Sequence, residues 1–283
     1  MTNKNKRVIL VTGASRGVGK GIAEGMARNG DTIICAARSQ KKGSTVQQFG
    51  FEIQSSLDET VEKIDAKGAR GVAYPIDLNN PKEILDLSEF IKKEFGQLDL
   101  LIHSACQIHD DLVQPKPYWE KSVDLWSVMD VGLKSNYLLS HALTPLMIAC
   151  KGKLIVQISS HGAMCYMHGP IYGAQKAGID KMAFDMAYDL KPHDICSLSL
   201  WSGIVKDEKT QKVSEMHGEQ YAEFLKGAAS QEYAGLVINE LYDDPSLMKL
   251  SGKTLLAAEI GTQYGVEDID DCTPKSDRRK SWG

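Results

Sequence analysis

Seven short apolar runs alternate with longer segments along most of the chain, and this alternation is the feature that most limits the possible folds. The runs are Val8–Val11, Thr32–Cys35, Gly71–Tyr74, Leu98–His103, Lys153–Ser159, Ile195–Leu200 and Lys253–Ala257. Near-continuous apolar strands are typical of parallel sheets whose two faces are both covered by helices. The pattern therefore predicts an α/β fold with a doubly wound parallel seven-stranded sheet and helices on both faces.

The segments between the runs have helical periodicity, which predicts helices over Val18–Asn29, Leu57–Lys67, Pro81–Glu94, Val123–Ile148, Tyr172–Leu190 and Ser230–Tyr242. A chain of 283 residues in this fold class forms one domain without difficulty. We expect a single domain over residues 1–265 and a polar tail over 266–283.

Composition excludes several classes of partner. The net charge is −4 and lysines are scattered among carboxylates, whereas nucleic-acid binding needs clustered basic side chains, so no nucleic acid is expected. No run approaches the roughly 18 apolar residues of a membrane span, and the polar N-terminus does not resemble a signal peptide. The six cysteines form no C-x-x-C pair and suit a reducing compartment. We expect a cytoplasmic protein that does not enter a membrane.

A glycine-rich turn, Gly13-Ala14-Ser15-Arg16-Gly17-Val18-Gly19, separates the first strand from the first helix. Such a turn brings a phosphate to the N-terminus of a helix, where free N–H groups and the helix dipole favour an anion. Glycines permit the tight turn and the close approach of backbone and ligand. The spacing favours a dinucleotide site over a plain strand-to-helix connection.

Two arginines favour NADP(H) over NAD(H). Arg16 lies within the glycine turn, and the second strand ends in Ala36-Ala37-Arg38 with no acidic residue. An acidic residue at this point usually holds the ribose hydroxyls of NAD, whereas arginine suits a 2′-phosphate. The alternative is that both arginines are solvated surface residues.

Tyr172 and Lys176 are four residues apart at the start of a predicted helix, so they lie on the same face about one turn apart. A neighbouring cation favours the phenolate, which makes Tyr172 the candidate general acid and base. Ser159 and Ser160 end the preceding strand, from which either hydroxyl could stabilise a reacting oxygen. A Tyr and a Lys four apart also arise by chance as a surface pair, and only their order after the glycine turn and the serines favours catalysis.

Two segments interrupt the alternation. Gln40–Ser56 is longer than an ordinary connection and is expected as a surface insertion beside the adenosine end of the nucleotide. Residues 206–229 follow the sixth strand at the carboxyl edge, where open sheets bind ligands, and are expected to form a substrate lid. His103, His161 and His168 match no zinc spacing, so no metal is expected. Cys106 and Cys165 are expected to be inert packing residues.

These motifs resemble the short-chain dehydrogenase/reductase family in the glycine turn, the Asp77-Leu78 pair, Ser-Ser, Tyr-x-x-x-Lys and Trp201–Val205. The resemblance spans about residues 6–260 and is greatest to the branch called dehydrogenase/reductase member 1. It implies a single-domain Rossmann fold that interconverts a carbonyl and a secondary alcohol on a small substrate. Tyr172 would donate the proton, Lys176 would bind the nicotinamide ribose, and Ser160 would orient the carbonyl.

The resemblance also implies the full set of cofactor contacts and a homodimer or homotetramer formed through the helices predicted at Val123–Ile148 and Tyr172–Leu190. The expected contacts are Gly13, Ser15, Arg16, Gly17, Val18, Gly19, Arg38, Asp77, Leu78, His103, Ala105, Tyr172, Lys176, Ile204 and Val205.

The chain departs from the family pattern at His103, Gly132, Ser202 and Asp207. Gly132 replaces an asparagine that often holds a proton-relay water, and Asn136, one turn further on, is the expected substitute. The departures leave a second interpretation open, namely a nucleotide-sensing or scaffold protein that kept the fold but lost turnover. The retained Ser, Tyr and Lys favour the enzyme.

Overall fold

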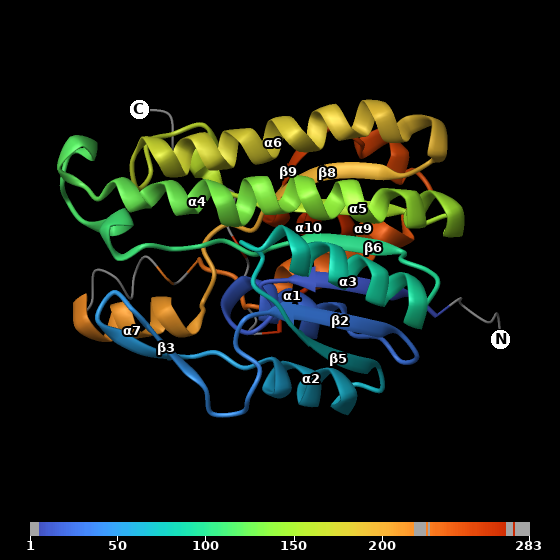
Figure 1. Cartoon of the computed structure of the whole chain (residues 1–283), viewed down its shortest axis with the longest axis horizontal. Helices are drawn as coiled ribbons and strands as arrows, with labels where there is room; N and C mark the ends of the chain where they lie inside the picture. Colours follow the sequence, from blue (N-terminus) through green and yellow to red (C-terminus); the bar gives the residue numbers. More distant parts are fainter. Residues whose placement is uncertain (1–5, 218–224, 226, 270–273, 275–283) are drawn as a thin grey trace.

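A seven-stranded sheet organises the computed structural model, which describes residues 6–217, 225, 227–269 and 274 (Figure 1). The strand order is β5-β2-β1-β6-β7-β8-β9, and every neighbouring pair is parallel. The strands are β1 (Val8–Thr12), β2 (Thr32–Ala37), β5 (Arg70–Pro75), β6 (Leu100–His103), β7 (Leu154–Ser159), β8 (Cys196–Trp201) and β9 (Thr254–Leu256). The predicted doubly wound seven-stranded sheet is confirmed, and its order reverses between β1 and β6, where such sheets bind ligands.

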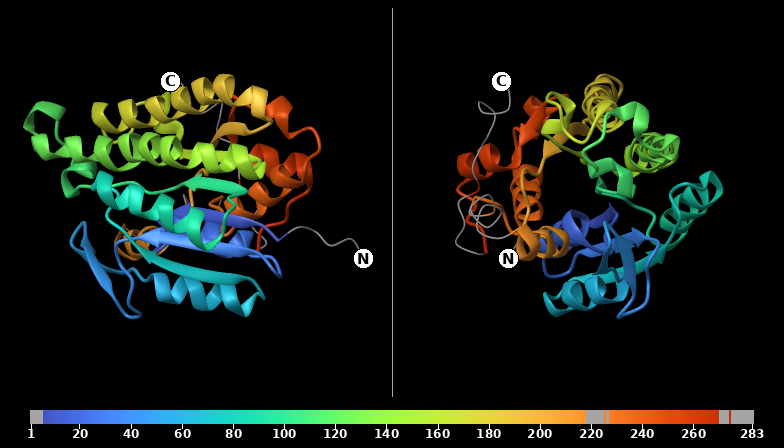
Figure 2. Two further views of the ribbon diagram at one scale, coloured as in Figure 1. Left: turned by 45° about the vertical axis from the view of Figure 1, so that its right-hand side comes forward. Right: turned by 90° about the vertical axis from the view of Figure 1, so that its left-hand side faces the viewer.

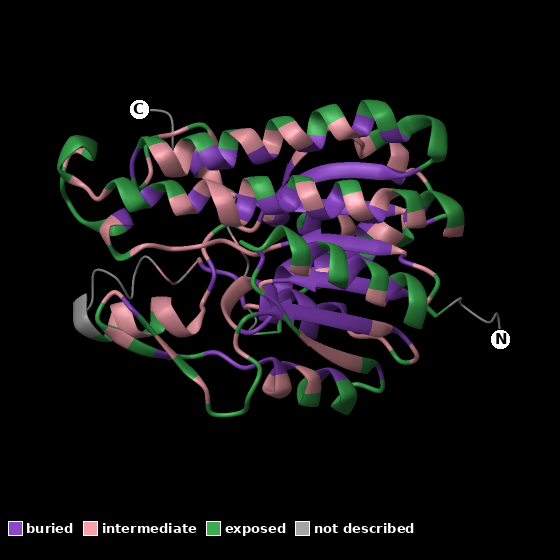
Figure 3. Ribbon diagram, in the orientation of Figure 1, coloured by how far each residue is buried: buried purple, intermediate pink, exposed green. Residues whose placement is uncertain are grey.

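Both faces of the sheet are buried, as the apolar runs predict. Along β1, Ile9 and Val11 pack into one core and Val8 and Leu10 into the other, because successive side chains of a strand point to opposite faces. Figure 3 shows the central strands fully buried between partly exposed helices. One face carries α1 (Gly17–Met26), α2 (Leu57–Ala66), α9 (Tyr233–Asp243) and α10 (Ala257–Tyr264), and the other carries α3 (Pro81–Glu94), α5 (Ser135–Cys150) and α6 (Pro170–Leu190).

The predicted continuous helix over Val123–Ile148 is wrong. The segment begins as a 3₁₀ turn (Val123–Trp126), passes through α4 (Ser127–Met129) and a π-helical stretch (Asp130–Lys134), and becomes regular only in α5. Val131 has extended backbone angles and Gly132 has φ 128°, a region that excludes most side chains. The apolar periodicity continued across the break and concealed it.

Two other segments gain structure that their sequence did not predict. Gln40–Ser56 contains an antiparallel hairpin, β3 (Thr45–Gln48) and β4 (Phe51–Gln54), which stands apart from the main sheet in Figure 2. Its turn residues Phe49 and Gly50 both have positive φ, as in the primed turns that join twisted strands. The predicted lid region contains α7 (Glu208–His217). Residues 218–224 and 226 of that region, and most of the predicted tail, lie outside the described residues.

Helix ends differ from the predictions by a few residues, and α10 was not predicted at all. Pro170 occupies the first turn of α6, where a missing N–H costs nothing, so this helix starts before Tyr172. No helix within the described part of the chain is both long and apolar enough to cross a membrane.

Candidate active site

A cavity of about 600 Å³ lies at the carboxyl ends of the central strands, where the strand order reverses. It has the size of a cofactor site. All but one of the predicted site residues line it, namely Gly13, Ser15, Arg16, Gly17, Val18, Gly19, Arg38, Asp77, Leu78, Ala105, Ser160, Tyr172, Lys176, Ile204 and Val205. The exception is His103.

The glycine turn needs its glycines for both conformation and space. Gly13 and Gly17 have φ of 74° and 54°, which favours glycine. A Cβ on Gly13 would lie 2.8 Å from the Cα of Ala105, and one on Gly19 would lie 2.4 Å from the carbonyl oxygen of Gly13. The turn therefore packs tightly against the start of α1 and against the loop after β6.

A carboxylate from the lid helix occupies the N-terminus of α1. The N–H of Gly17 donates to Oε2 of Glu208 at 3.1 Å, and Lys20 Nζ lies 3.4 Å from Oε1 of the same side chain. Arg16, the residue before the helix, makes no side-chain cap of its own. The turn thus binds the Glu208 carboxylate in this structure, because free N–H groups at a helix N-terminus favour an anion.

Arg16 and Arg38 line the same end of the cavity. Burial lowers the pKa of the Arg16 guanidinium, and repulsion from Arg38 lowers it further, while Glu208 and Asp207 act in the opposite direction. Nη1 of Arg16 is buried and has no partner among the described residues. A second anion between the two guanidinium groups would supply that partner and relieve the repulsion.

The three candidate catalytic side chains meet at the far end of the cavity. Ser160, at the end of β7, places its Oγ 3.0 Å from the phenolic oxygen of Tyr172 on the first turn of α6. Nζ of Lys176 lies 5.5 Å from the centre of the Tyr172 ring and 3.5 Å from the carbonyl oxygen of Ile158. The hydroxyl of Ser159 is instead buried and donates to the backbone oxygen of Lys176. The geometry thus selects Ser160 from the two serines.

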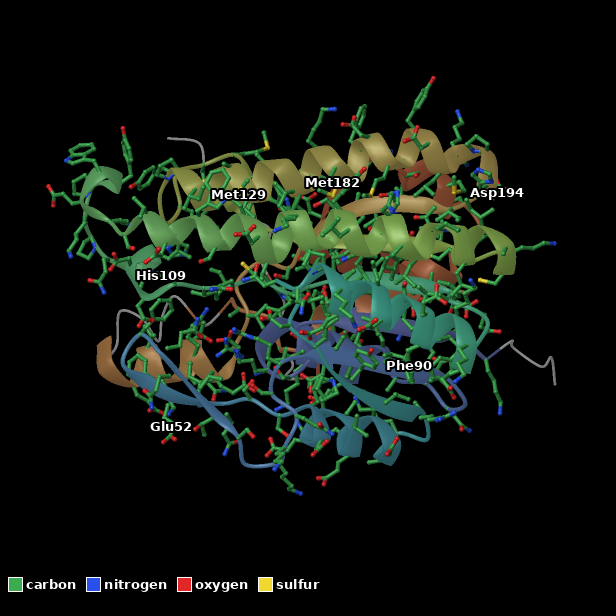
Figure 4. All side chains as sticks on the ribbon, in the orientation of Figure 1. Glu52, Phe90, His109, Met129, Met182 and Asp194 are labelled. Atoms are coloured by element: carbon green, nitrogen blue, oxygen red, sulfur yellow. The ribbon has the colours of Figure 1, made fainter. Side chains whose placement is uncertain are left out.

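Three segments outside the central strands contribute to the cavity lining, namely the β3–β4 hairpin, the loop after β6 and α7. The hairpin contributes Val46, Gln48 and Ile53 to the lining, and α7 contributes Glu208 and Lys209. The N–H of Phe49 donates to Asp110 of the loop after β6, and Lys212 of α7 donates to the backbone oxygen of Glu52. Figure 4 labels Glu52 on the hairpin and His109 beside Asp110 at the same end of the molecule. The sequence signals for this cover were the unusual length of Gln40–Ser56 and the position of residues 206–229 after the sixth strand.

Comparison with known proteins identifies the family. A sequence model described as short chain dehydrogenase matches residues 7–218, which is most of the chain and includes the glycine turn, Ser160, Tyr172 and Lys176. The chain belongs to the short-chain dehydrogenase family. It is an NAD(P)-dependent dehydrogenase or reductase.

Curated relatives of this dehydrogenase match it over 76% to 94% of the chain. The human protein "Dehydrogenase/reductase SDR family member 1" is 31% identical over 277 residues, which cover 94% of this chain and 84% of the human one. The mouse protein of the same name is 30% identical over 93% of this chain and 83% of its own. A 3-oxoacyl-[acyl-carrier-protein] reductase of Buchnera aphidicola is 28% identical over 76% of this chain and 80% of its own.

Solved structures share the fold of this dehydrogenase at low identity. L-sorbose reductase from Gluconobacter frateurii, complexed with NADPH and L-sorbose, is 19% identical and superposes with a TM-score of 0.72 over 96% of this chain and 98% of its own. The 3-oxoacyl-[acyl-carrier protein] reductase from Brucella melitensis, in complex with NAD, is 20% identical, with a TM-score of 0.74 over 90% of this chain and 96% of its own.

His103 is placed differently from its expected role as a cofactor contact in this dehydrogenase. Its side chain is 1% exposed and lies in the core, with Nε2 2.8 Å from the hydroxyl of Ser140 and with Nδ1 unpartnered among the described atoms. Burial lowers the pKa of His103 to about 3, so the ring is neutral. The backbone beyond it faces the site, where the N–H groups of Ser104 and Ala105 donate to Thr12 Oγ1.

Asn136, the expected substitute for the asparagine missing at Gly132, lies in the core and outside the cavity lining. Its amide is buried and donates to Gln157 Oε1 at 2.9 Å, and neither residue lines the cavity. Of the three histidines near the site, His161 packs on Trp201 and His168 packs edge-on to Tyr172. The described residues contain no group of His, Cys, Asp and Glu side chains that could hold a metal ion.

Proposed function

We propose that this dehydrogenase uses NADPH to interconvert a carbonyl and a secondary alcohol on a small substrate. The observation that carries the proposal is the contact between Ser160 Oγ and the Tyr172 phenol beside Lys176 in the cavity. The two hydroxyls, 3.0 Å apart, can both reach one oxygen atom of a substrate. NADPH, when bound, would supply the hydride.

Each residue of the set has a distinct task in carbonyl reduction. The Tyr172 hydroxyl gives its proton to the substrate oxygen, and Ser160 donates a hydrogen bond to the same atom as negative charge develops on it. The Lys176 cation favours the phenolate that remains. In alcohol oxidation the same phenolate accepts the proton. Tyr172 and Lys176 lie on α6, and Ser160 directly follows β7, so the groups are preorganised and little reorganisation is needed.

The preference for NADP(H) rests on Arg16 and Arg38. The half-buried Arg16, with an unpartnered Nη1 among the described residues, and the exposed Arg38, which repels it, fit a 2′-phosphate between them. No acidic residue ends β2, where NAD enzymes usually carry one. The structural relatives include complexes with NADPH and with NAD, so the arginine pair is the reason for choosing between them.

A second candidate function is nucleotide sensing without turnover. The Glu208 carboxylate accepts a hydrogen bond from the N–H of Gly17 at the start of α1, and it would compete with a phosphate for that donor. Asp207 also approaches the turn, since a Cβ on Gly17 would lie 3.4 Å from its Oδ2. The intact Ser160, Tyr172 and Lys176 arrangement supports the enzyme over this alternative, because a sensor has no chemical use for the phenol.

We also propose that the protein forms a homodimer or homotetramer in the cytoplasm. Tyr137, Phe184 and Tyr188 on α5 and α6 are more than half exposed, and exposed large apolar groups often mark an interface. Cys35, Cys106, Cys150, Cys165 and Cys196 are free thiols, which supports a reducing compartment.

The test combines a fluorescence titration with NADPH and NADH and a panel of carbonyl substrates, using wild type, Tyr172→Phe and Tyr166→Phe. Tyr166 is 83% exposed outside the cavity and serves as the control. We expect NADPH to bind more tightly than NADH, and Tyr172→Phe to lower kcat by about 10²- to 10⁴-fold while NADPH binding persists. Equal turnover by wild type and Tyr172→Phe would refute the proposed role. Tight NADPH binding with no turnover of any substrate would favour the sensor.

A further inference from the structure

The helix break before α5 carries an unusual pairing between a glycine and a buried amide. At the break, Val131 and Gly132 leave helical geometry, and the N–H of Gly132 donates to Ser135 Oγ at 3.0 Å. Carbonyl groups beside such a break lack their usual helical donors. They must find other donors, because an unpaired buried carbonyl is costly.

Gln175 supplies those donors from the catalytic helix. Its Nε2 lies 2.6 Å from the carbonyl oxygen of Val128 and 3.4 Å from that of Val131. The side chain is fully buried, and Gln175 directly precedes Lys176 and lies one turn after Tyr172. A single amide therefore joins the break to the helix that carries two of the three catalytic side chains.

The same amide contacts the loop after β6, which lines the cavity. Nε2 of Gln175 is 3.4 Å from Sγ of Cys106, and the Cys106 thiol lies 3.7 Å from Oε1. The N–H of Gln107 donates to the carbonyl of Val131 at 3.2 Å. Gln175 thus lies where three elements meet: α6, the helix break, and the loop that carries Cys106 and Gln107 into the cavity lining.

Gly132 makes room for this amide. A Cβ at position 132 would lie 2.3 Å from Nε2 of Gln175, and the φ of 128° would itself strain any other residue. The Gln175 amide can therefore occupy its place only because residue 132 has no side chain. The amide that organises this break comes from α6 and not from the broken helix.

We propose that Gln175 is a positioning residue for the reaction, holding α6 in register with the loop after β6 so that Tyr172 and Lys176 face the reacting atoms. The proposal rests on the proposed function. Removing the amide takes its donor from the Val128 carbonyl, leaves the Val131 carbonyl with the Gln107 N–H alone, and lets α6 shift relative to the loop. A shift on the order of 1 Å can lower a rate about 10²-fold.

The test compares Gln175→Leu with Gln157→Leu. Gln157 is equally buried and also hydrogen-bonded, but it lies on β7 outside the cavity lining, so its loss reports destabilisation alone. We expect both variants to lower the melting temperature, and only Gln175→Leu to lower kcat, by about 10- to 100-fold, and to shift the pH profile of kcat. We expect the KM of Gln175→Leu to equal that of wild type. Wild-type kcat and pH profile in Gln175→Leu, or equal losses in both variants, would overturn the proposal.

A second readout separates this proposal from the proposed function. The rate of Cys106 alkylation by iodoacetamide, followed by peptide mass spectrometry, needs no turnover. We expect Gln175→Leu to raise this rate several-fold while Gln157→Leu leaves it unchanged, because the Gln175 side chain contacts the thiol, whereas the Gln157 side chain bonds to Asn136. If wild type turns over no substrate, faster alkylation in Gln175→Leu still supports the link, and an unchanged rate overturns it.

Discussion

At the scale of single residues, burial alters the hydrogen-bond partners and the pKa values of ionisable side chains in and near the cavity. Arg16 and His103 show this in two ways. The buried guanidinium of Arg16 keeps its charge but lacks a partner for Nη1 among the described residues. The imidazole of His103 instead remains neutral, because its burial disfavours the cation. The unpartnered Nη1 of Arg16 favours binding of an anion. The buried neutral ring of His103 makes the stability of the folded state depend on pH.

Arg38→Ala should weaken binding of NADPH and leave binding of NADH nearly unchanged. A hydrogen bond to a charged group contributes about 1.5–3 kcal/mol, which corresponds to roughly a tenfold to hundredfold change in Kd. Fluorescence titration with both nucleotides measures the difference. Arg70→Ala is the control, since Arg70 lies on β5 outside the cavity lining. Equal weakening of both nucleotides by Arg38→Ala would argue against a 2′-phosphate contact.

His103 should make the folded state less stable in acid. The unfolded chain takes up a proton at the ordinary pKa of about 6.5, whereas the folded chain resists it down to a pKa of about 3. The unfolded state therefore binds more protons between these values, so this contribution is present above pH 6.5 and is lost as the pH falls. From pH 7 to pH 5 the loss from this residue is about 2 kcal/mol.

Denaturant unfolding of wild type and His103→Gln at both pH values measures that loss. We expect the difference between pH 7 and pH 5 to shrink in His103→Gln and to persist in His141→Gln, because His141 is exposed on α5. An equal pH dependence in wild type and His103→Gln would show that the buried ring is protonated without penalty.

At the scale of elements, the cavity is covered by segments from three parts of the chain. The hairpin β3–β4, the loop after β6 and the lid helix α7 are joined by the contacts of Phe49 with Asp110 and of Lys212 with Glu52. The first residue of α7, Glu208, also binds the N-terminus of α1. A bound nucleotide would bring its phosphates to that same N-terminus, so lid position and nucleotide binding should be coupled.

Glu208→Gln should tighten NADPH binding. The substitution removes a negative charge from the place where phosphate is expected, and two unit charges about 4 Å apart interact by about 1 kcal/mol even in water, or roughly fivefold in Kd. Calorimetric titration of the variant against wild type measures the change. Glu215→Gln, an exposed position on the same helix, should leave Kd unaltered. Weaker NADPH binding in Glu208→Gln would mean that the carboxylate supports the site.

At the scale of the whole molecule, α5 and α6 lie on the same side of the sheet and leave aromatic side chains in solvent (Figure 1). Tyr188 is 82% exposed and Phe184 59%. Burial of such groups against a second copy is the proposed basis of a homodimer or homotetramer.

Tyr188→Asp combined with Phe184→Asp should therefore convert the assembly to monomers, because charged groups would have to be desolvated at the interface. Light scattering after size-exclusion chromatography gives the mass of each species. The matched control is Leu85→Asp, which alters an apolar side chain on α3 that is about as exposed as Phe184 and lies outside the predicted interface segments. An unchanged assembly in the double variant would place the interface elsewhere.

Much of the fold could be predicted because burial on both faces of a parallel sheet leaves a continuous apolar signal in the sequence. Six of the seven strands of the main sheet carry that signal, whereas the edge strand β5 is only partly buried. All the predicted site residues except His103 line the cavity, and the glycine turn, Ser160 and Tyr172 each follow a strand or lie in the first turn of a helix. A residue that directly follows a parallel strand lies at the carboxyl edge of the sheet. Its location can therefore be predicted from the order of strands and helices along the chain.

Only the tertiary structure decided which groups meet across long sequence separations. The amide of Gln175 at the Gly132 break, the carboxylate of Glu208 on the glycine turn and the ring of His103 in the core all depend on packing between elements. Periodicity records how a segment divides its side chains between core and solvent, and it carries no information on which distant side chain fills a given space. The sequence alone therefore determined the sheet and the candidate catalytic set, and the packing decided how that set is held and covered.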